Sequence, residues 1–341
     1  MSSTVTIYGA YGHTGRFIVT ELIRRGWTPI LSGRNESQLR RLARGYPGLA
    51  IRPATVDDPY ALDRALAGSV AVINAAGPFG DTTPALVEAA LRAGIHYLDV
   101  AAEVEVVAGT VAAYQDRAAA AGIVIAPALA FYGGLGDLLA TAAMADLAAA
   151  DEIHLAFALD SWIPTEGTRA SGRASRARRN GKRLVYTDGE LTLRDDPVPV
   201  TDWTFPAPFG KQTVVGDFTT ADSVTIPRHL KTAALHTYMT AAPLGDLALP
   251  DRTPQPTDES GRSAQQFLVE VVIRSGDTQR RAIAAGRDIY AVSAPIAVEA
   301  LSHITSGAHT GLLTAGQIAA PGNLLRALHP THLDRLEINC N

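Results

Sequence analysis

The length, composition and charge of the chain exclude several classes of protein. Its 341 residues are too many for one ordinary hydrophobic core and favour two domains, and 47% of them are hydrophobic. A formal net charge of -4 argues against a nucleic-acid binder, which would normally be basic. Apolar runs fall short of the roughly 18 residues that a membrane span needs, so no membrane contact is expected.

The cysteine count and the N-terminal residues indicate the cellular compartment of the protein. Cys340 is the only cysteine of the chain, so it forms no internal disulfide and no cysteine-based metal site. Residues 1–4 lead directly into an apolar run, without the basic stretch, apolar core and cleavage site of a signal peptide. We therefore expect a cytoplasmic protein in a reducing compartment.

Residues 1–130 alternate between strand and helix patterns. Strands are expected at residues 5–8, 29–32, 49–52, 70–74, 96–100 and 123–126. Helices are expected at 16–25, 35–44, from 59 onward, and at 83–93 and 104–121. Helices between successive strands imply crossover connections, so this part should form a doubly wound, mostly parallel sheet of the α/β class.

The pattern changes after residue 130. A helix is expected at 135–147 and a strand at 153–159, followed by hairpin signals at Asp188-Gly189 and at residues 275–277. Residues 250–261 indicate an exposed loop, and residues 294–304 and 310–318 indicate helices. Antiparallel pairs of this kind predict a second, mixed α+β domain over residues 131–300.

A glycine-rich turn follows the first strand and opens the first helix. Residues 9–15 read Gly-Ala-Tyr-Gly-His-Thr-Gly. A glycine motif placed between a strand and a helix is typical of a dinucleotide-binding turn. Gly9 permits the tight turn, Gly12 lets the backbone approach a pyrophosphate, and Gly15 lets the helix pack close to the sheet. The N–H groups of the helix N-terminus then face the phosphates. The alternative is a glycine turn that only packs. We predict a Rossmann dinucleotide site that also includes Tyr11, His13 and Thr14.

The end of the second strand indicates which dinucleotide is bound. An NAD-selective domain usually carries an acidic residue there that accepts from the ribose 2′-OH, but this strand ends Ser32-Gly33-Arg34-Asn35. The guanidinium of Arg34 suits a 2′-phosphate instead, although a solvated arginine is the alternative. We therefore predict NADP(H) as the cofactor, contacted by Ser32, Arg34 and Asn35.

Two further segments complete the predicted cofactor site. Ala75, Ala76 and Gly77 follow a central strand, where small residues leave room for the ribose and nicotinamide. Asp57 follows the third strand and is a candidate acceptor for the adenine amino group. Its alternative role is to cap the helix that begins near Pro59.

Three residues are candidates for substrate chemistry because they stand at strand ends or at the start of the second domain. Glu103, Tyr132 and Asp137 meet that condition. Each has an alternative: Glu103 as an acid in the first turn of a helix, Tyr132 as a half-buried loop tyrosine, and Asp137 as a structural residue.

A run of basic residues stands out in the second domain. Arg169, Arg173 and Arg176 have the spacing of one helical face and could hold a carboxylate or phosphate of the substrate. The alternative is a face turned to solvent or to a neighbouring subunit. An anionic substrate oriented by these arginines is the hypothesis that follows.

Four runs together resemble the saccharopine dehydrogenase-like oxidoreductases, a group that includes trans-acting enoyl reductases. They are residues 9–16, 32–34, 74–79 and 93–99, with Ala102-Glu103 where the family has Gly-Glu. The resemblance, clear over residues 1–130, implies a second domain whose sheet faces the nicotinamide. It also implies that C-terminal helices, in residues 301–341, pack back on the first domain. The Gly-Phe-Asp-Ser-Ile-Pro-like stretch of the enoyl reductases is absent from residues 128–137.

These observations predict an NADPH-dependent reductase of a C=N or C=C bond in a small or carrier-bound metabolite. One rival is a non-catalytic NADP(H) sensor, and another is an NAD-dependent dehydrogenase that works oxidatively. The nine histidines show no metal-ligand spacing, so no metal is expected. A small molecule is the expected partner, and a homodimer is compatible with the sequence.

Overall fold

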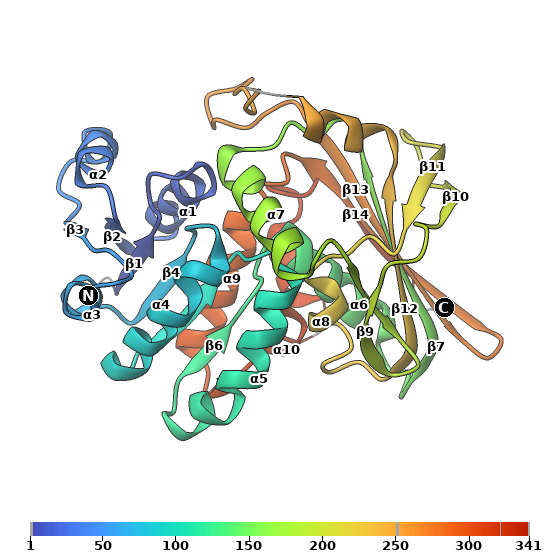
Figure 1. Cartoon of the computed structure of the whole chain (residues 1–341), viewed down its shortest axis with the longest axis horizontal. Helices are drawn as coiled ribbons and strands as arrows, with labels where there is room; N and C mark the ends of the chain where they lie inside the picture. Colours follow the sequence, from blue (N-terminus) through green and yellow to red (C-terminus); the bar gives the residue numbers. More distant parts are fainter. Residues whose placement is uncertain (1–2, 250–251, 321, 340–341) are drawn as a thin grey trace.

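The computed structural model describes residues 3–249, 252–320 and 322–339. Cys340, on which the compartment prediction rests, lies outside these residues. Figure 1 shows two sheets side by side, with the N-terminal elements around one and the later strands forming the other. Helix α7 (Glu166–Arg178) lies between the two halves.

The first sheet has seven parallel strands in the order β15-β6-β5-β4-β1-β2-β3. Its central register places Ile7 opposite Leu31 and Ile73, and all three side chains are fully buried. Such continuous apolar strands are typical of a parallel sheet covered on both faces. The predicted fold class is confirmed. The strands are β1 (Thr4–Tyr8), β2 (Thr28–Gly33), β3 (Ile51–Pro53), β4 (Ala71–Asn74), β5 (His96–Asp99), β6 (Val124–Ala126) and β15 (Gly311–Leu312).

The helices between these strands begin where polar side chains satisfy their first N–H groups. The Asn35 carbonyl Oδ1 accepts from Gln38 N at 3.1 Å, and Asp58 Oδ1 accepts from Ala61 N at 2.9 Å. Helix α4 begins at Phe79, four residues before the predicted start, because a carboxylate from a distant segment caps it (see below). The helices are α1 (His13–Arg24), α2 (Glu36–Ala43), α3 (Pro59–Leu66), α4 (Phe79–Ala93) and α5 (Val104–Ala120).

The second sheet has nine strands, with a main path β10-β11-β12-β7-β13-β14-β16 and the β8–β9 hairpin attached to β12. Only β12 and β7 pair in parallel among the described strands of this sheet. Both predicted hairpins are present. The strands are β7 (Ala150–Leu159), β8 (Arg183–Thr187), β9 (Glu190–Arg194), β10 (Val200–Thr204), β11 (Lys211–Gly216), β12 (Thr232–Thr240), β13 (Gln266–Ser275), β14 (Thr278–Arg287) and β16 (Arg335–Asn339).

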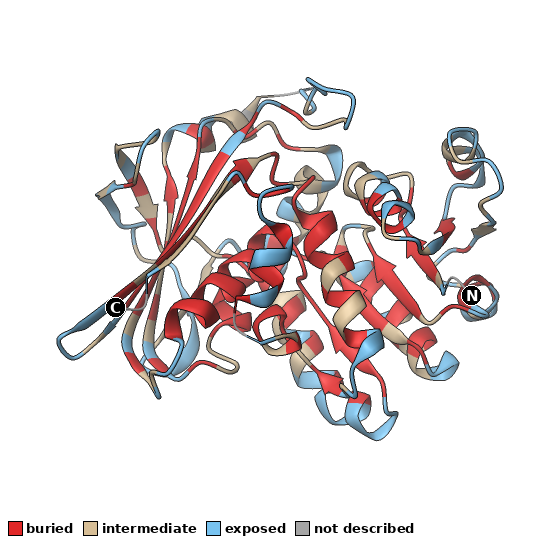
Figure 2. Cartoon of the chain, turned by 180° about the vertical axis from the view of Figure 1, so that it is seen from behind, coloured by how far each residue is buried: buried red, intermediate tan, exposed pale blue. Residues whose placement is uncertain are grey.

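Helices α6 and α9 join the two sheets into one body. Helix α9 packs against α1, and α6 packs against β13 and β14, so one apolar core contains both Ile7 and Val271. Figure 2 shows the buried residues concentrated in the central strands and in the helices between them. The elements outside the sheets are η1 (Phe131–Leu135), α6 (Gly136–Met144), α7, α8 (Asp222–Thr225), η2 (Ala242–Ala248), α9 (Ser293–Ser306), α10 (Ala315–Ile318) and α11 (Asn323–Leu328).

The helix predicted over residues 310–318 is wrong in its first half. Gly311 N donates to Ile123 O at 2.8 Å and Leu313 N donates to Ile125 O at 3.0 Å, so β15 extends the first sheet beside β6. The edge of β6 offers backbone partners that a local helix would leave unpaired. The last strand, β16, pairs instead with β14 of the second sheet. Residues after 300 therefore complete both sheets, where the sequence predicted helices returning to the first domain only.

Asp137 lies in the first turn of α6 and is fully buried. Its carboxylate accepts from His229 Nε2 at 2.6 Å and from Gly316 N at 2.8 Å. It therefore ties α6 to α10 and to the segment before β12.

We expect Asp137→Ala to lower the free energy of unfolding by about 3 kcal/mol, because buried donors on two other segments lose their acceptor. Denaturant unfolding followed by circular dichroism measures this change. Asp116→Ala, at an exposed position of α5, is the control and should shift stability by less than about 0.5 kcal/mol. Equal effects of the two substitutions would show that the Asp137 contacts do not stabilise the fold.

Candidate functional site

The turn between β1 and α1 has a different steric requirement at each of its glycines. Gly9 has a φ of +85°, and a Cβ there would lie 2.9 Å from the backbone of Ala75. A Cβ on Gly15 would lie 2.3 Å from Gly9 O, so only glycine lets α1 begin this close to the turn. Gly12 has an ordinary φ of -65°, and its added Cβ would meet Gly9 O at 3.1 Å. Gly12 is thus the glycine whose missing side chain leaves space for a ligand.

A cleft of about 680 Å³ opens beside this turn, lined by loops of the first domain and by segments of the second. The loop after β4 is shaped by Asn74, whose Oδ1 accepts from Ala76 N at 3.0 Å. Nine of the residues predicted to contact the cofactor line the cleft: Gly9, Tyr11, Gly12, His13, Thr14, Arg34, Ala75, Ala76 and Gly77.

Four other residues predicted for the cofactor do not line this cleft: Gly15, Ser32, Asn35 and Asp57. The Ser32 hydroxyl is buried and donates to Arg52 O at 2.8 Å, toward β3. Asn35 caps α2, and Gly15 packs against the turn. Asp57 is exposed, and its neighbour Asp58 is the residue that caps α3. Gly15, Ser32 and Asn35 thus shape the elements around the cleft.

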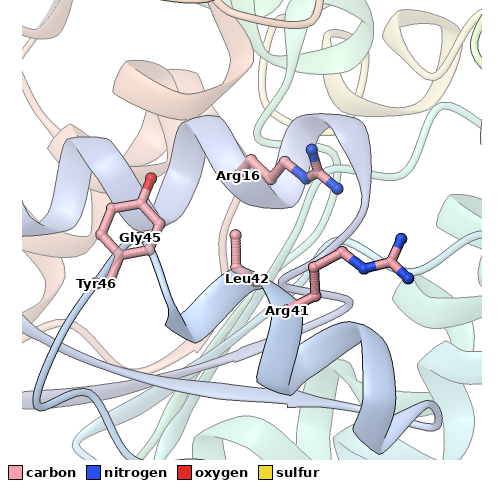
Figure 3. Close-up of a pocket in the computed structure, with 5 residues that line it drawn as sticks. All are labelled: Arg16, Arg41, Leu42, Gly45 and Tyr46. Atoms are coloured by element: carbon pink, nitrogen blue, oxygen red, sulfur yellow. The ribbon is translucent and has the colours of Figure 1, made fainter.

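Arg34 lines the cleft with an exposed side chain that makes no hydrogen bond or ion pair within the described part of the chain. A permanently charged group without a protein partner, next to a phosphate-binding turn, is well suited to bind a phosphate. A second hollow, of about 420 Å³, lies between α1 and α2. Figure 3 shows the guanidinium groups of Arg16 and Arg41 extending to the same side of it. Arg16 Nε donates to Tyr11 O at 3.1 Å, which adds positive charge beside the glycine turn.

Glu103 lines the cleft, but the protein itself uses its carboxylate. It is 3% exposed and accepts from Phe79 N at 2.7 Å and from Gly80 N at 3.3 Å. The carboxylate therefore caps the N-terminus of α4. Arg178 of α7 donates to the same carboxylate at 2.6 Å and also bonds Asp81. The sequence placed Glu103 in the first turn of a helix, and it does precede α5, but its side chain stabilises the neighbouring helix.

Tyr132 lies in an aromatic wall on the second-domain side of the cleft. Its ring centroid is 4.9 Å from that of Phe131, 5.0 Å from Phe157 and 5.7 Å from Trp162. The side chain is 8% exposed, and its hydroxyl has no hydrogen-bond partner among the described residues. Burial raises the pKa of Tyr132 well above its usual value, so the phenol stays protonated and can donate.

Asp222 positions the turn that carries Tyr132. Its Oδ2 accepts from Gly133 N at 2.8 Å, and burial raises the pKa of this carboxyl to about 7. Gly133 has a φ of +90°, and a Cβ there would lie 2.7 Å from that of Ala128. No sequence pattern pointed to Asp222, because its partner is 89 residues away along the chain.

The predicted substrate arginines lie on a different face of α7 from the one that lines the cleft. Arg169, Arg173 and Arg176 do not line the cleft. Arg173 and Arg176 are exposed, and Arg169 donates to the carbonyl oxygens of Leu247 and Arg252. At about 100° per residue, their face is roughly a third of a turn from the one that does line the cleft. The lining face carries Thr168, Ser171, Ser175 and Arg179.

Sequence reasoning missed most of the second-domain wall. A Cβ on Gly77 would lie 2.4 Å from Ser171 Oγ, so α7 packs directly on the loop after β4. Asp137, a candidate in the sequence, does not line the cleft. The missed lining residues come from separate segments with no shared motif, and include Trp162, Ser171, Phe218, Thr220 and Tyr290.

The fold and the cleft define a dinucleotide-binding protein in which a second sheet domain completes the site. Residues 5–126 match the family model "Saccharopine dehydrogenase NADP binding domain". The match confirms the resemblance seen in the sequence over this part of the chain, and NADP(H) is the cofactor. No helix of the described residues is both long and apolar enough to cross a membrane.

Two known proteins extend the comparison. A relative from Arabidopsis thaliana, named "Probable mitochondrial saccharopine dehydrogenase-like oxidoreductase", is 32% identical over 142 residues, which cover 37% of this chain and 31% of that protein. The matched part thus spans about a third of the relative's length. The structure of apo saccharopine dehydrogenase (L-Glu forming) from Saccharomyces cerevisiae matches 99% of this chain and 100% of its own, with a TM-score of 0.66 and 12% identity. The whole chain therefore has the saccharopine dehydrogenase fold.

We expect Arg34→Ala to weaken NADPH binding by about 1–3 kcal/mol, because a charge-assisted hydrogen bond to the 2′-phosphate is lost. NADH binding should hardly change, since NADH lacks that phosphate. Fluorescence titration with both cofactors measures the two affinities, and Arg64→Ala, on α3, is the control for loss of a surface arginine. Equal losses for NADPH and NADH would remove Arg34 from the 2′-phosphate site.

We expect Gly12→Val to abolish NADPH binding in a protein that still folds. The φ of Gly12 suits valine and Gly9 O needs to move only slightly, whereas the branched side chain would take the space of the pyrophosphate. Gly15→Val, by contrast, should destabilise the fold, because its Cβ would lie 2.3 Å from Gly9 O. Thermal melting and cofactor titration of both variants separate the two effects, and a folded Gly12→Val protein with full affinity would contradict this site.

Proposed function

We propose that the protein is an NADPH-dependent reductase of a C=C or C=N bond in an uncharged, largely apolar substrate. The NADP-binding domain supports the cofactor half of this proposal. The single observation that carries the enzymatic half is the Tyr132 hydroxyl, a buried donor in the cofactor cleft with no partner among the described residues. A buried polar group without a partner is unfavourable unless a ligand satisfies it.

The charges in the cleft support an uncharged substrate. Arg34 and Arg179 are the arginines of the described residues that line it. Arg34 stands beside the glycine turn and is assigned to the cofactor phosphate. Arg179 bonds Lys182 O and lies 3.5 Å from a carboxylate oxygen of Glu105, which offsets part of its charge. His13 also lines the cleft, and burial lowers its pKa, which keeps it neutral near pH 7. The three arginines of the anionic-substrate hypothesis do not line the cleft, which favours an uncharged substrate.

The remaining wall of the cleft is aromatic and hydroxylated. Trp162, Phe218 and Tyr290 line it together with Tyr132, and rings of this kind bind apolar or planar groups. The Tyr290 hydroxyl already accepts from Thr165 N at 3.3 Å and from Thr168 Oγ1 at 3.0 Å. Tyr132 and Thr220 each present a hydroxyl without a partner in the described structure. We infer a substrate with an apolar body and one polar acceptor group.

The chemistry assigned to Tyr132 is that of a hydrogen-bond donor. NADPH, when bound, supplies the hydride, which forms a new C–H bond at the electron-poor carbon of the double bond. The displaced electron pair moves to the carbonyl oxygen of an enoyl substrate or to the nitrogen of an imine. A protonated Tyr132 donates a hydrogen bond to that atom and stabilises its developing negative charge, and a proton from solvent completes the reduction.

We expect Tyr132→Phe to lower kcat by about 10²-fold or more and to leave the Kd of NADPH unchanged. Loss of NADPH absorbance, with neutral enoyl thioesters and cyclic imines as substrates, measures the rate. Tyr114→Phe is the matched control, because Tyr114 is also 8% exposed but does not line the cleft. Substrates with an added carboxylate should react more slowly than their neutral counterparts.

Three outcomes would count against the proposal. Full turnover by Tyr132→Phe would remove Tyr132 as the donor, and a preference for carboxylated substrates would restore the anionic hypothesis. If the wild-type protein binds NADPH tightly but oxidises it with none of these substrates, the sensor function becomes the better explanation.

A further inference from the structure

The second sheet carries a cluster of metal-ligating side chains that the cleft does not use. Glu152 and His154 stand on β7, and His236 stands on β12. The two strands pair in parallel with His236 directly opposite His154. Residues two apart on a strand share one face, so the three side chains project from the same face of the sheet. Their ligand atoms all lie within 4.8 Å of one another.

This face of the sheet is the one turned away from the cleft. Ile153, Leu155 and Phe157 of β7 belong to the core shared with the first domain. Alternation along the strand therefore places Glu152 and His154 on the opposite face. None of Glu152, His154 and His236 lines the cleft. The cluster is independent of the proposed reductase site.

The distances are close to those of a coordination site. His154 Nε2 is 2.9 Å from Glu152 Oε2, and His236 Nε2 is 4.0 Å from Glu152 Oε1. The two imidazole centroids are 4.9 Å apart. Zinc binds nitrogen and oxygen at about 2.0–2.2 Å, so ligand atoms of a tetrahedral site lie roughly 3.4 Å apart. The Glu152 and His236 side chains are 42% and 37% exposed, which leaves them room for this small adjustment.

His154 has a potential hydrogen-bond partner on its second ring nitrogen, as metal-binding histidines usually do. The side chain is 10% exposed, and Tyr238 Oη lies 3.3 Å from its Nδ1. A partner on one ring nitrogen fixes the orientation of the ring and leaves the other nitrogen for the metal.

We propose that Glu152, His154 and His236 bind one Zn²⁺ ion on the outer face of the second sheet. Two imidazoles and one carboxylate form a set that zinc favours, with water completing four-coordination. The ion would link β7 to β12, strands that are 82 residues apart between the two histidines. Because the site is remote from the cleft, its role is to stabilise the sheet.

Arg274 is the competitor for this site. It lies opposite Glu152 on β13, with Nη1 3.5 Å from Glu152 Oε2, and its side chain is 53% exposed. A metal ion that binds Glu152 must displace the Arg274 guanidinium from its carboxylate. Removal of Arg274 should therefore strengthen metal binding, whereas removal of a ligand should weaken it.

The test is calorimetric titration of the tag-free full chain with Zn²⁺, in a Cys340→Ser background that removes its only thiol. We expect one ion per chain. His154→Ala and His236→Gln should each bind Zn²⁺ at least about tenfold more weakly, because even the loss of a residue that only supports a ligand lowers metal affinity by that factor. Because His154 is largely buried, His236→Gln is the decisive variant. His303→Ala is the matched control, since His303 is 35% exposed and lies 3.4 Å from Glu299 without a third ligand.

Two further measurements sharpen the result. Arg274→Gln should bind Zn²⁺ several-fold more tightly than its parent, and Co²⁺ should give the visible absorption of a tetrahedral nitrogen–oxygen site that His236→Gln abolishes. NADPH affinity should be the same in all these variants, which separates this proposal from the reductase function. Absence of Zn²⁺ binding, or equal affinity in His236→Gln and His303→Ala, would overturn the site.

Discussion

The buried carboxylate of Glu103 joins the two halves of the cleft. It accepts from two backbone N–H groups at the N-terminus of α4 and from the guanidinium of Arg178 on α7. A negative charge at a helix N-terminus is favourable, and hydrogen bonds to a charged group are stronger than neutral ones. The position of α7 depends on this interaction, and α7 forms one wall of the cleft. The β4–α4 loop is thereby fixed against the second domain even though the two are distant in sequence.

The core behind this cleft explains why the two sheets form one body. Helix α9 packs on α1 of the first domain, α6 packs on β13 and β14 of the second, and a single apolar cluster runs through both. The C-terminal residues strengthen the connection because β15 and β16 complete different sheets. The turn that holds Tyr132 lies in the middle of this core, between β6 and α6. Gly133, with its positive φ, and its hydrogen bond to Asp222 set the path of the turn that carries the tyrosine.

The positions of the arginines relative to the cleft are the basis for the proposed substrate class. Arginines are numerous on α7, but those on its outer faces bind backbone carbonyls, pair with acids or face solvent. Arg34 remains beside the glycine turn without a protein partner in the described residues. The cleft thus offers one cationic end for the cofactor phosphate and an aromatic end for the substrate. The saccharopine dehydrogenase fold of the whole chain is shared with the yeast enzyme at 12% identity, so the fold alone leaves the substrate open.

The sequence by itself determined the features that depend on neighbours along the chain. The strand–glycine turn–helix unit at residues 9–15, the helix that opens at Asn35, and the hairpins of the second sheet all follow from local rules of backbone geometry. The prediction of NADP rather than NAD came in the same way from the residues at the end of the second strand. Only the tertiary structure decided what Glu103 and Asp137 contact, which face of α7 lines the cleft, and that residues 311–312 form a strand. It also brought His236 beside His154. Pairings across tens of residues depend on strand order and helix rotation, which periodicity along the chain does not encode.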